Sequence, residues 1–522
     1  MQNKQTYKAL ARVRLALLWS LLFVVLGFAA HMGINLYDDG IILVGAQQLL
    51  RGEYLYRDVW TLYSPGQFYV LSGLMAIFGP APLLLKVWGT TAKASIALLF
   101  YLLLRNETQP VYALAWTVPL LLLLGMFTFD GFPVLPALAL LLLMLIQLRS
   151  IRTFTEYRRL FWCGVTLAGS GFFRHDLAAY ALVAVVLYLL VYGYCQQARG
   201  SVSAGTVRRA VFSLLLGAML IAAPVALYLL VTSGWQLLYE SFLVAPATIY
   251  VPYRQLPWPS PLGGINASVY FPYVVAVFFV LLARGPEDAG SRPWLTLLCL
   301  CMLLLSLKGW VRTEFYHMLQ ALVPALLLFA VLLYQQARHK RWLASVLLLS
   351  IFALLLQPLL HASWQVVAKQ LQHNRLLLLT GCQPDPARMG CLDVGADYAQ
   401  TVRWIEQNTS VDSCIYVGPA RHDKVFVNAV AVYFLAGRAP CTAWYETHPG
   451  LQTRADIQQL MQQDLKAGQP SAVILDSRWD HISEPNLSGV SSGAVALDQY
   501  LKANYVPVAQ FGTVVVYQAE KN

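Results

Sequence analysis

The chain has 522 residues, of which 58% are hydrophobic and 12% are charged, and its formal net charge is +11. Soluble domains are about half apolar and about a quarter charged, so this composition excludes a chain that is soluble throughout. Leucine-rich runs recur from residue 13 to about residue 360 and then stop. This pattern predicts a polytopic α-helical membrane protein with a soluble C-terminal domain.

Eleven apolar stretches are candidate membrane-spanning helices, since a span needs about 20 mainly apolar residues. They are residues 13–31, 83–104, 111–127, 132–148, 160–173, 177–194, 210–231, 269–284, 294–307, 316–334 and 342–360. The apolar stretch 66–79 has only 14 residues and predicts an interfacial or re-entrant helix. Residues 1–360 therefore form a predicted membrane domain, with a first external loop at 32–82.

Basic residues orient the predicted spans. With the N-terminus in the cytoplasm, the internal loops hold seventeen Lys and Arg against four Asp and Glu. The external loops before residue 361 hold six basic residues against eight acidic ones. By the positive-inside rule, the N-terminus is cytoplasmic and the C-terminal domain is external. The basic excess serves this orientation and needs no nucleic acid as a partner.

The external region, residues 361–522, is predicted to be a small α/β domain. Residues 413–418, 471–476 and 513–518 have the composition of strands, and residues 398–408 and 428–437 that of helices. Four of the eight cysteines lie in this domain: Cys382, Cys391, Cys414 and Cys441. An even number in an oxidising compartment favours disulfides, and the short loop is the easiest to close. We expect the pairs Cys382–Cys391 and Cys414–Cys441.

Ionisable residues gather in five predicted external loops, and charges close to a membrane core tend to be functional. Carboxylates can take a proton from a hydroxyl, and cations can hold a phosphate leaving group. Each residue also has a structural alternative: a snorkelling cation at a helix end, an Asp in a turn, or, for Asp38, a helix cap. The adjacent carboxylates of Asp38 and Asp39 predict a nearby positive group, from Arg174, Lys308, Arg312 or a metal.

The first loop reads YDDGIILVGAQQLLRGEYLYRDVWTLYSPGQFYVLSGLMAIFG. It resembles the start of the GT-C glycosyltransferase superfamily, in particular bacterial relatives of the protein O-mannosyltransferases and the lipid A aminoarabinose transferases. The matching features are the acidic pair Asp38-Asp39, the segment GEYLYRD, Pro65-Gly66 and Phe78-Gly79. Asp39 stands where this pattern usually has Glu. The stretch YFLAGRAPCTAWYETHPG, residues 433–450, is similar to the C-terminal regions of such proteins, though less specifically.

The resemblance implies transfer of a hexosyl or pentosyl group, with inversion, from a polyprenyl-phosphate sugar to a hydroxyl acceptor. The acceptor would be a glycan, lipid or protein outside the bacterial cytoplasmic membrane. Asp38 would be the base and Asp39 a supporting carboxylate. The donor phosphate would bind Arg312, Lys308 and Arg174. An acidic, metal or acceptor site would comprise Asp130, Asp176, His175 and His317, where carboxylates alone suit Mg²⁺ or Mn²⁺ and a histidine admits other metals.

Two other functions stay open at this stage. A transporter of sugars or lipid-linked sugars would have a solvated path to both faces of the membrane. A non-catalytic membrane scaffold would bind a partner through the C-terminal domain and would lack a cavity beside Asp38.

Overall fold

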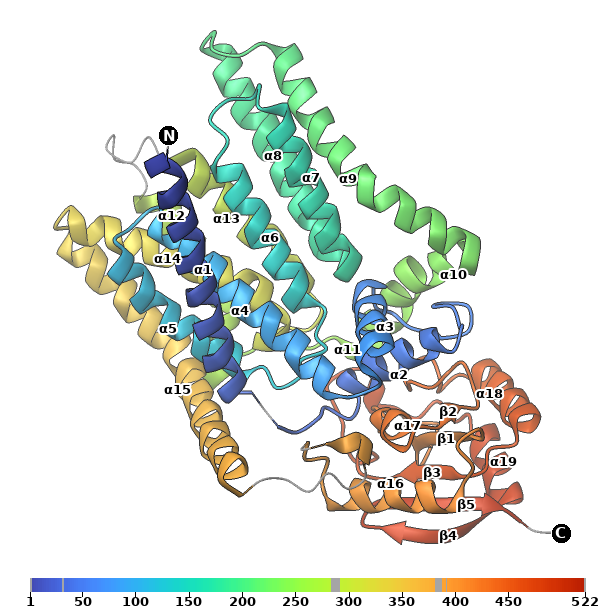
Figure 1. The fold of residues 1–522 in the computed structure, drawn as a ribbon. Coiled ribbons are helices and arrows are strands. Elements are labelled where there is room, and N and C mark those ends of the chain that lie inside the picture. The colour runs from blue at the N-terminus through green and yellow to red at the C-terminus, as the bar shows by residue number, and fades with distance from the viewer. Residues whose placement is uncertain (1, 31, 283–291, 381–386, 391, 521–522) are drawn as a thin grey trace.

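The computed structural model of the protein describes residues 2–30, 32–282, 292–380, 387–390 and 392–520. A bundle of long helices leads into a C-terminal domain with a small sheet, and two short helices, α2 and α3, lie between them (Figure 1). The bundle helices are α1 (Gln2–Phe28), α4 (Leu83–Arg105), α5 (Pro110–Met126), α6 (Val134–Arg149), α7 (Tyr157–Phe173), α8 (His175–Ala198), α9 (Ala204–Ser233), α12 (Phe271–Leu282), α13 (Arg292–Ser306), α14 (Phe315–Arg338) and α15 (Trp342–Thr380).

The predicted membrane spans are all helical in the structure. Among the described residues, eight helices are long and apolar enough to cross a membrane. The others, α5, α6 and α7, have 17, 16 and 17 residues and are shorter than a typical span. The multi-pass membrane class is thus confirmed, while the number of eleven spans stays a prediction. Helix α15 has 39 residues and continues beyond residue 360, where the leucine-rich pattern ends.

The two short helices form a layer at the end of the bundle. Helix α2 (Asp38–Leu50) and helix α3 (Gly66–Phe78) have 13 residues each. A helix of this length is about 20 Å long, against a hydrocarbon core of about 30 Å. Helix α3 is therefore too short to span the membrane, as its sequence predicts. The chain between α9 and α12 also reaches this layer, through α10 (Trp235–Tyr239), two π-helical turns and α11 (Val251–Arg254).

The C-terminal domain has the predicted α/β architecture. Its sheet has the order β2-β1-β3-β5-β4, with β1 parallel to β2 and β3, and β5 antiparallel to β3 and β4. The strands are β1 (Cys414–Pro419), β2 (Ala439–Pro440), β3 (Val473–Asp476), β4 (Tyr505–Phe511) and β5 (Val514–Ala519), and the helices are α16 (Ala396–Asn408), α17 (Ala431–Ala436), α18 (Ala455–Gly468) and α19 (Ala496–Asn504). The three predicted strands and two predicted helices are present.

Cysteine pairing agrees with the sequence where the structure describes it. Cys414 on β1 and Cys441, directly after β2, form a disulfide. Cys382 and Cys391, the other expected pair, lie outside the described residues.

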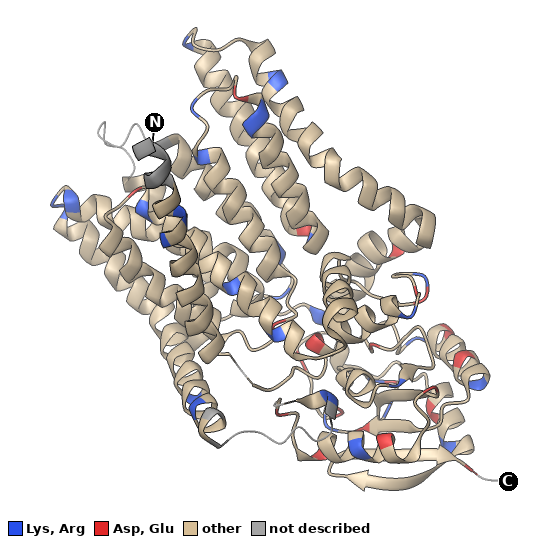
Figure 2. Ribbon diagram, viewed as in Figure 1, with Lys and Arg blue, Asp and Glu red and all other residues tan. Residues whose placement is uncertain are grey.

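The C-terminal domain contacts the 32–82 loop through α2 and α17. Gly40 on α2 lies directly against the backbone of Ala431, where a side chain at position 40 would collide. The Ala431 amide donates to the Leu36 carbonyl oxygen over 2.8 Å. Lys and Arg cluster at the bundle end away from this domain, where the N-terminus lies, whereas charges of both signs meet at the domain boundary (Figure 2). The candidate site lies at that boundary.

Candidate functional site

The N-terminus of α2 sets the direction of both aspartates. The Asn35 side-chain oxygen accepts hydrogen bonds from the amides of Tyr37 (3.0 Å) and Asp38 (2.8 Å). The Asp39 carboxylate accepts in return from the Asn35 amide over 3.1 Å. This reciprocal arrangement resembles a capping box. The Asn35 side chain thus holds the turn that leads into α2. Asp38 is itself the first residue of the helix, and its carboxylate accepts from the side chains of Asn35 and Tyr63, so the alternative that Asp38 caps the helix is wrong.

Asp38 is partly buried, and its carboxylate points toward the first external loop. It accepts hydrogen bonds from the Tyr63 hydroxyl (3.3 Å) and the Asn35 side-chain amide (3.2 Å). Burial raises the pKa of Asp38, opposed chiefly by the positive charge of Arg254 and by the Tyr63 hydrogen bond. The carboxylate lies at a tight recess between residues of the 32–82 loop and of the loop after α5, lined by Asp38, Ile42, Tyr63, Phe129, Gly131, Phe132 and Pro133. A raised pKa brings a carboxylate closer to the range of an effective general base at neutral pH.

Asp39 points away from this recess and is completely buried. Its carboxylate accepts from the Gly131 amide over 2.8 Å and lies 3.9 Å from the Lys86 ammonium. Burial raises the pKa of Asp39 to about 6, although Lys86 opposes this shift, and the Asp130 carboxylate adds to it. Asp39 thus joins the first loop to the loop after α5 rather than facing a substrate.

Asp130 closes a buried ion network with two lysines of α4. Its carboxylate lies 3.0 Å from the Lys86 ammonium and 2.8 Å from the Lys93 ammonium. These charges outweigh burial and lower the pKa of Asp130. Gly89 lies on the same helix face, and any side chain there would collide with Asp130. The spacing of Lys86, Gly89 and Lys93 puts all three toward Asp130.

This network does not fit the expected divalent metal. Lys86 stands between the carboxylates of Asp39 and Asp130, which supplies the positive charge that a metal would otherwise bring. Across the described parts of the chain, no group of three or more His, Cys, Asp or Glu is arranged to hold a metal ion. The positive group that the acidic pair predicts is present, but it consists of Lys86 beside Asp39, and of Arg254 and Arg312 near Asp38.

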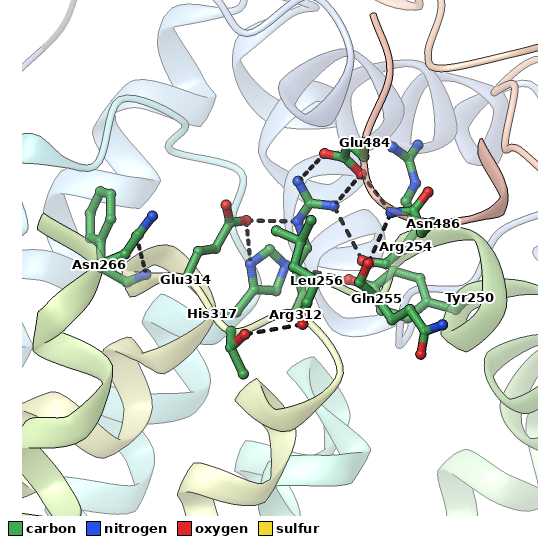
Figure 3. A network of polar contacts seen from close by, with 12 residues as sticks. Tyr250, Arg254, Gln255, Leu256, Asn266, Arg312, Glu314, His317, Glu484 and Asn486 are labelled. Atoms are coloured by element: carbon green, nitrogen blue, oxygen red, sulfur yellow. Dashed lines mark hydrogen bonds and ion pairs between the residues drawn. The ribbon is translucent and has the colours of Figure 1, made fainter. Parts of the chain in front are cut away.

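Arg312 belongs to a second network that reaches the C-terminal domain (Figure 3). Its guanidinium donates to Glu314 over 2.7 Å and to both carboxylate oxygens of Glu484 over 2.9 and 2.6 Å. The Asn486 side chain, two residues further on, donates to the Gln255 carbonyl oxygen over 2.9 Å. Arg312 is thus already neutralised, and it holds the 484–486 segment of the C-terminal domain against the membrane domain.

The remaining predicted site residues surround this network. Arg174 pairs with Asp176 over 2.5 Å, and the His175 ring is 2.9 Å from the Ser64 hydroxyl. His317 lies 3.0 Å from Glu314. Lys308 lies within electrostatic range of Arg174, Asp176 and Glu314. In the described parts of the chain its ammonium forms no ion pair, and it lies 5.5 Å from the centroid of the Phe132 ring.

Tyr250 and Arg254 lie beside the Arg312 network, and Arg254 extends its electrostatic reach to Asp38. The pKa of Tyr250 is raised by burial, against the charges of Arg312, Arg254 and Arg174. Arg254 is buried, donates to the Phe426 carbonyl oxygen over 2.8 Å, and acts electrostatically on Asp38. The structure therefore gathers Asp38, Lys308, Arg174 and Arg312 at one boundary. The expected group of Asp130, Asp176, His175 and His317 is divided, because Asp130 lies in the lysine network.

Sequence reasoning missed several residues of the site. The sequence could have indicated Lys86 and Lys93, because two lysines seven residues apart in an apolar span lie on the same face of a helix. Glu446 and His448 lie in the stretch 433–450, whose resemblance to related C-terminal regions was the only signal. Glu484 had none, because a carboxylate in a soluble loop does not reveal an arginine partner 172 residues away.

Comparison with known proteins supports the fold. No family model matches the sequence, and no curated protein matches it. Among solved structures, ArnT from Cupriavidus metallidurans bound to undecaprenyl phosphate is similar over 99% of both chains, with 13% identity and a TM-score of 0.55. The Archaeoglobus fulgidus oligosaccharyltransferase in complex with zinc and sulfate aligns over 96% of this chain and 73% of its own, with 11% identity and a TM-score of 0.48. The chain has the fold of ArnT, as the resemblance to the GT-C superfamily implies.

Proposed function

We propose that the protein is a glycosyltransferase that moves a sugar from a polyprenyl-phosphate donor to a hydroxyl acceptor at the external face of the bacterial cytoplasmic membrane. The observation that carries this proposal is Asp38, a partly buried carboxylate that forms no ion pair with a described residue, accepts hydrogen bonds from Tyr63 and Asn35, and lies within electrostatic range of Arg254. The ArnT-like fold supports a lipid-linked donor, since the ArnT structure contains undecaprenyl phosphate.

The reaction assigns a separate task to each part of the site. Asp38 takes the proton of the acceptor hydroxyl, and the acceptor oxygen forms a bond to the anomeric carbon. The bond between that carbon and the phosphate oxygen breaks, and its electron pair stays on the phosphate. The products are an inverted glycoside and the polyprenyl phosphate, whose charge is stabilised by cations.

Lys308 is the cation best suited to the donor phosphate. Arg312 is held by Glu314 and Glu484, and Arg174 by Asp176, so their charges are largely balanced. Lys308 forms no ion pair with any described residue, which leaves its ammonium available for a charge-assisted hydrogen bond.

The test is a turnover assay with purified protein and a panel of undecaprenyl-phosphate hexoses and pentoses. We expect release of undecaprenyl phosphate from at least one donor. Asp38→Asn keeps the shape of the side chain but removes the base, and should lower the rate about 100-fold or more. Its melting temperature and its affinity for undecaprenyl phosphate should stay unchanged. A wild-type protein that consumes no donor would contradict the proposed function, and a fully active Asp38→Asn variant would contradict the role of Asp38.

A further inference from the structure

The segment Tyr445–Gly450 of the C-terminal domain lies against the first external loop, next to Asp38. The Tyr445 hydroxyl donates to the Ile41 carbonyl oxygen of α2 over 3.2 Å. The Tyr37 hydroxyl donates to the Thr447 carbonyl oxygen over 3.2 Å. The segment is thus joined to Tyr37, directly before α2, and to Ile41, in the first turn of α2. More than 400 residues separate the partners in sequence.

Side chains of the C-terminal domain hold the backbone of this segment through hydrogen bonds. The Asn428 side chain donates to the Tyr445 carbonyl oxygen over 2.9 Å and accepts from the Thr447 amide over 3.0 Å. The Gln452 side chain donates to the Glu446 carbonyl oxygen over 2.8 Å. These contacts hold the main chain in one position, so the directions of the side chains at 446–448 are also set.

Three consecutive side chains in this anchored segment have unpaired polar atoms. Glu446 Oε2, Thr447 Oγ1 and His448 Nδ1 are buried, and none of these three atoms has a hydrogen-bond partner within the described structure, although the Glu446 side chain also has a hydrogen bond to Thr61. The three residues are 1%, 0% and 7% exposed. Buried polar groups in proteins are nearly always paired, and exceptions call for a bound group that completes them. Three adjacent exceptions on a rigid backbone indicate a ligand site rather than a packing fault.

The neighbours of Glu446 place this site at the proposed reaction centre. Burial raises the pKa of Glu446 well above its usual value, and the charge of Asp38 raises it further. Glu446 also acts electrostatically on Tyr37 and Tyr63, the latter being a hydrogen-bond donor to Asp38. Glu446 and Asp38 therefore lie within electrostatic range of each other, although one comes from the C-terminal domain and the other from α2.

The chemistry of the three groups favours a neutral, hydroxyl-rich ligand. A protonated Glu446 both donates and accepts hydrogen bonds. Burial lowers the pKa of His448 well below its usual value, and the charge of Arg254 lowers it further, so its ring is neutral. The Trp60 ring packs against His448 edge-on, with centroids 6.4 Å apart, and gives the site an apolar wall. Neutral donors and acceptors beside an aromatic ring suit a sugar rather than a phosphate or a cation.

We propose that Glu446, Thr447 and His448 bind the hydroxyl groups of a sugar next to Asp38, so that the C-terminal domain forms part of the substrate site. This inference rests on the proposed glycosyl transfer, and it adds the residues that recognise the sugar. The sugar is either the one on the lipid donor or part of a glycan acceptor, and both present the same hydroxyl chemistry.

Equilibrium binding tests this without requiring turnover. The probes are undecaprenyl phosphate, undecaprenyl phosphate carrying a hexose or a pentose, and a panel of free disaccharides. We expect one sugar-bearing probe to bind the wild-type protein, and Glu446→Ala and His448→Phe each to weaken that binding about tenfold, the loss of one good polar contact. Glu446→Gln keeps a donor and an acceptor and should retain most of the affinity. All variants should bind undecaprenyl phosphate like the wild type.

The control is Asp456→Asn, which changes an exposed carboxylate of the same domain that pairs with Arg454. An effect on lipid-linked sugars assigns the site to the donor, and an effect confined to free disaccharides assigns it to the acceptor. If no sugar-bearing probe distinguishes Glu446→Ala and His448→Phe from the wild type, the inference is wrong. Sugar binding that depends on Glu446 in a protein without turnover would keep this site and reject the proposed transfer.

Discussion

Asp38 and Asp39 are neighbours in sequence, yet they belong to polar clusters of opposite character. Asp39 lies in a closed cluster with Lys86, Lys93 and Asp130, in which buried charges of both signs face one another. Asp38 lies in an open cluster with Glu446, in which neither carboxylate forms an ion pair with a described residue and the Oε2 atom of Glu446 has no hydrogen-bond partner there. The closed cluster fixes how the loops pack on α4, whereas the open one has atoms left for a ligand.

Helix geometry explains why Asp38 and Asp39, two aspartates at adjacent positions, have different surroundings. A helix turns by about 100° per residue, so consecutive side chains leave α2 in different directions. Asp39 points toward Gly131 and the lysines, while Asp38 points toward Tyr63 and the C-terminal domain. The state of pairing, more than residue type, separates a structural carboxylate from one that is available for chemistry.

The largest expected effect comes from breaking the closed cluster with Asp130→Ala. The substitution leaves the Lys86 and Lys93 ammoniums buried without their main partner, which typically costs about 3–5 kcal/mol of stability. We expect a clearly lower midpoint in thermal unfolding of the purified protein. Asp38→Ala is the matched control, because it removes a carboxylate from the open cluster and should leave the midpoint nearly unchanged. If Asp130→Ala and Asp38→Ala both unfold at the same midpoint as the wild type, the distinction between the two clusters is wrong.

A smaller effect is expected for Lys308→Ala, measured as affinity for undecaprenyl phosphate. Loss of one charge-assisted hydrogen bond, worth about 1.5–3 kcal/mol, corresponds to about 10- to 100-fold weaker binding. Thermal stability should change little, because Lys308 forms no ion pair with a described residue. Lys93→Ala should show the opposite pattern. Its thermal stability should fall, whereas the fraction that remains folded should bind undecaprenyl phosphate with unchanged affinity. Full affinity in Lys308→Ala would show that the phosphate is held elsewhere.

Much of the fold could be predicted from sequence, because apolar run length and basic-residue placement report on the membrane directly. The short helix 66–78 and the Cys414–Cys441 disulfide also followed from local patterns. The strand β2 has only two residues and left no pattern to read. The site was only partly predictable: Asp38 and its hydrogen-bond partner Tyr63 lie in the first loop, but the charged groups that act on Asp38 electrostatically come from α11 and the C-terminal domain. Such contacts depend on how distant segments pack, which periodicity does not encode.

The smallest expected effect concerns the Arg312 network, which joins the two domains and lies beside the open cluster. Burial opposes ionisation of Glu314, but His317 and Arg312 outweigh it and lower the pKa of Glu314 to about 2. Burial likewise opposes ionisation of Glu484, but its hydrogen bonds to Arg312 and Asn486, together with nearby positive charge, outweigh burial and lower its pKa. A carboxylate with a lowered pKa contributes stability above its unfolded pKa of about 4.3, and this contribution is lost as pH falls toward the folded value.

We therefore expect the wild-type protein to lose more stability between about pH 5 and pH 3 than Glu484→Gln, by about 1 kcal/mol. The measurement is hydrogen exchange of the 480–490 segment at both pH values, with thermal unfolding beside it. Asp456→Asn is the matched control, because its exposed pair with Arg454 should contribute almost nothing. If Glu484→Gln and the wild type respond equally to acid, Arg312 does not hold the C-terminal domain in place. Its charge would then be available to the donor phosphate, and the network would belong to the open cluster.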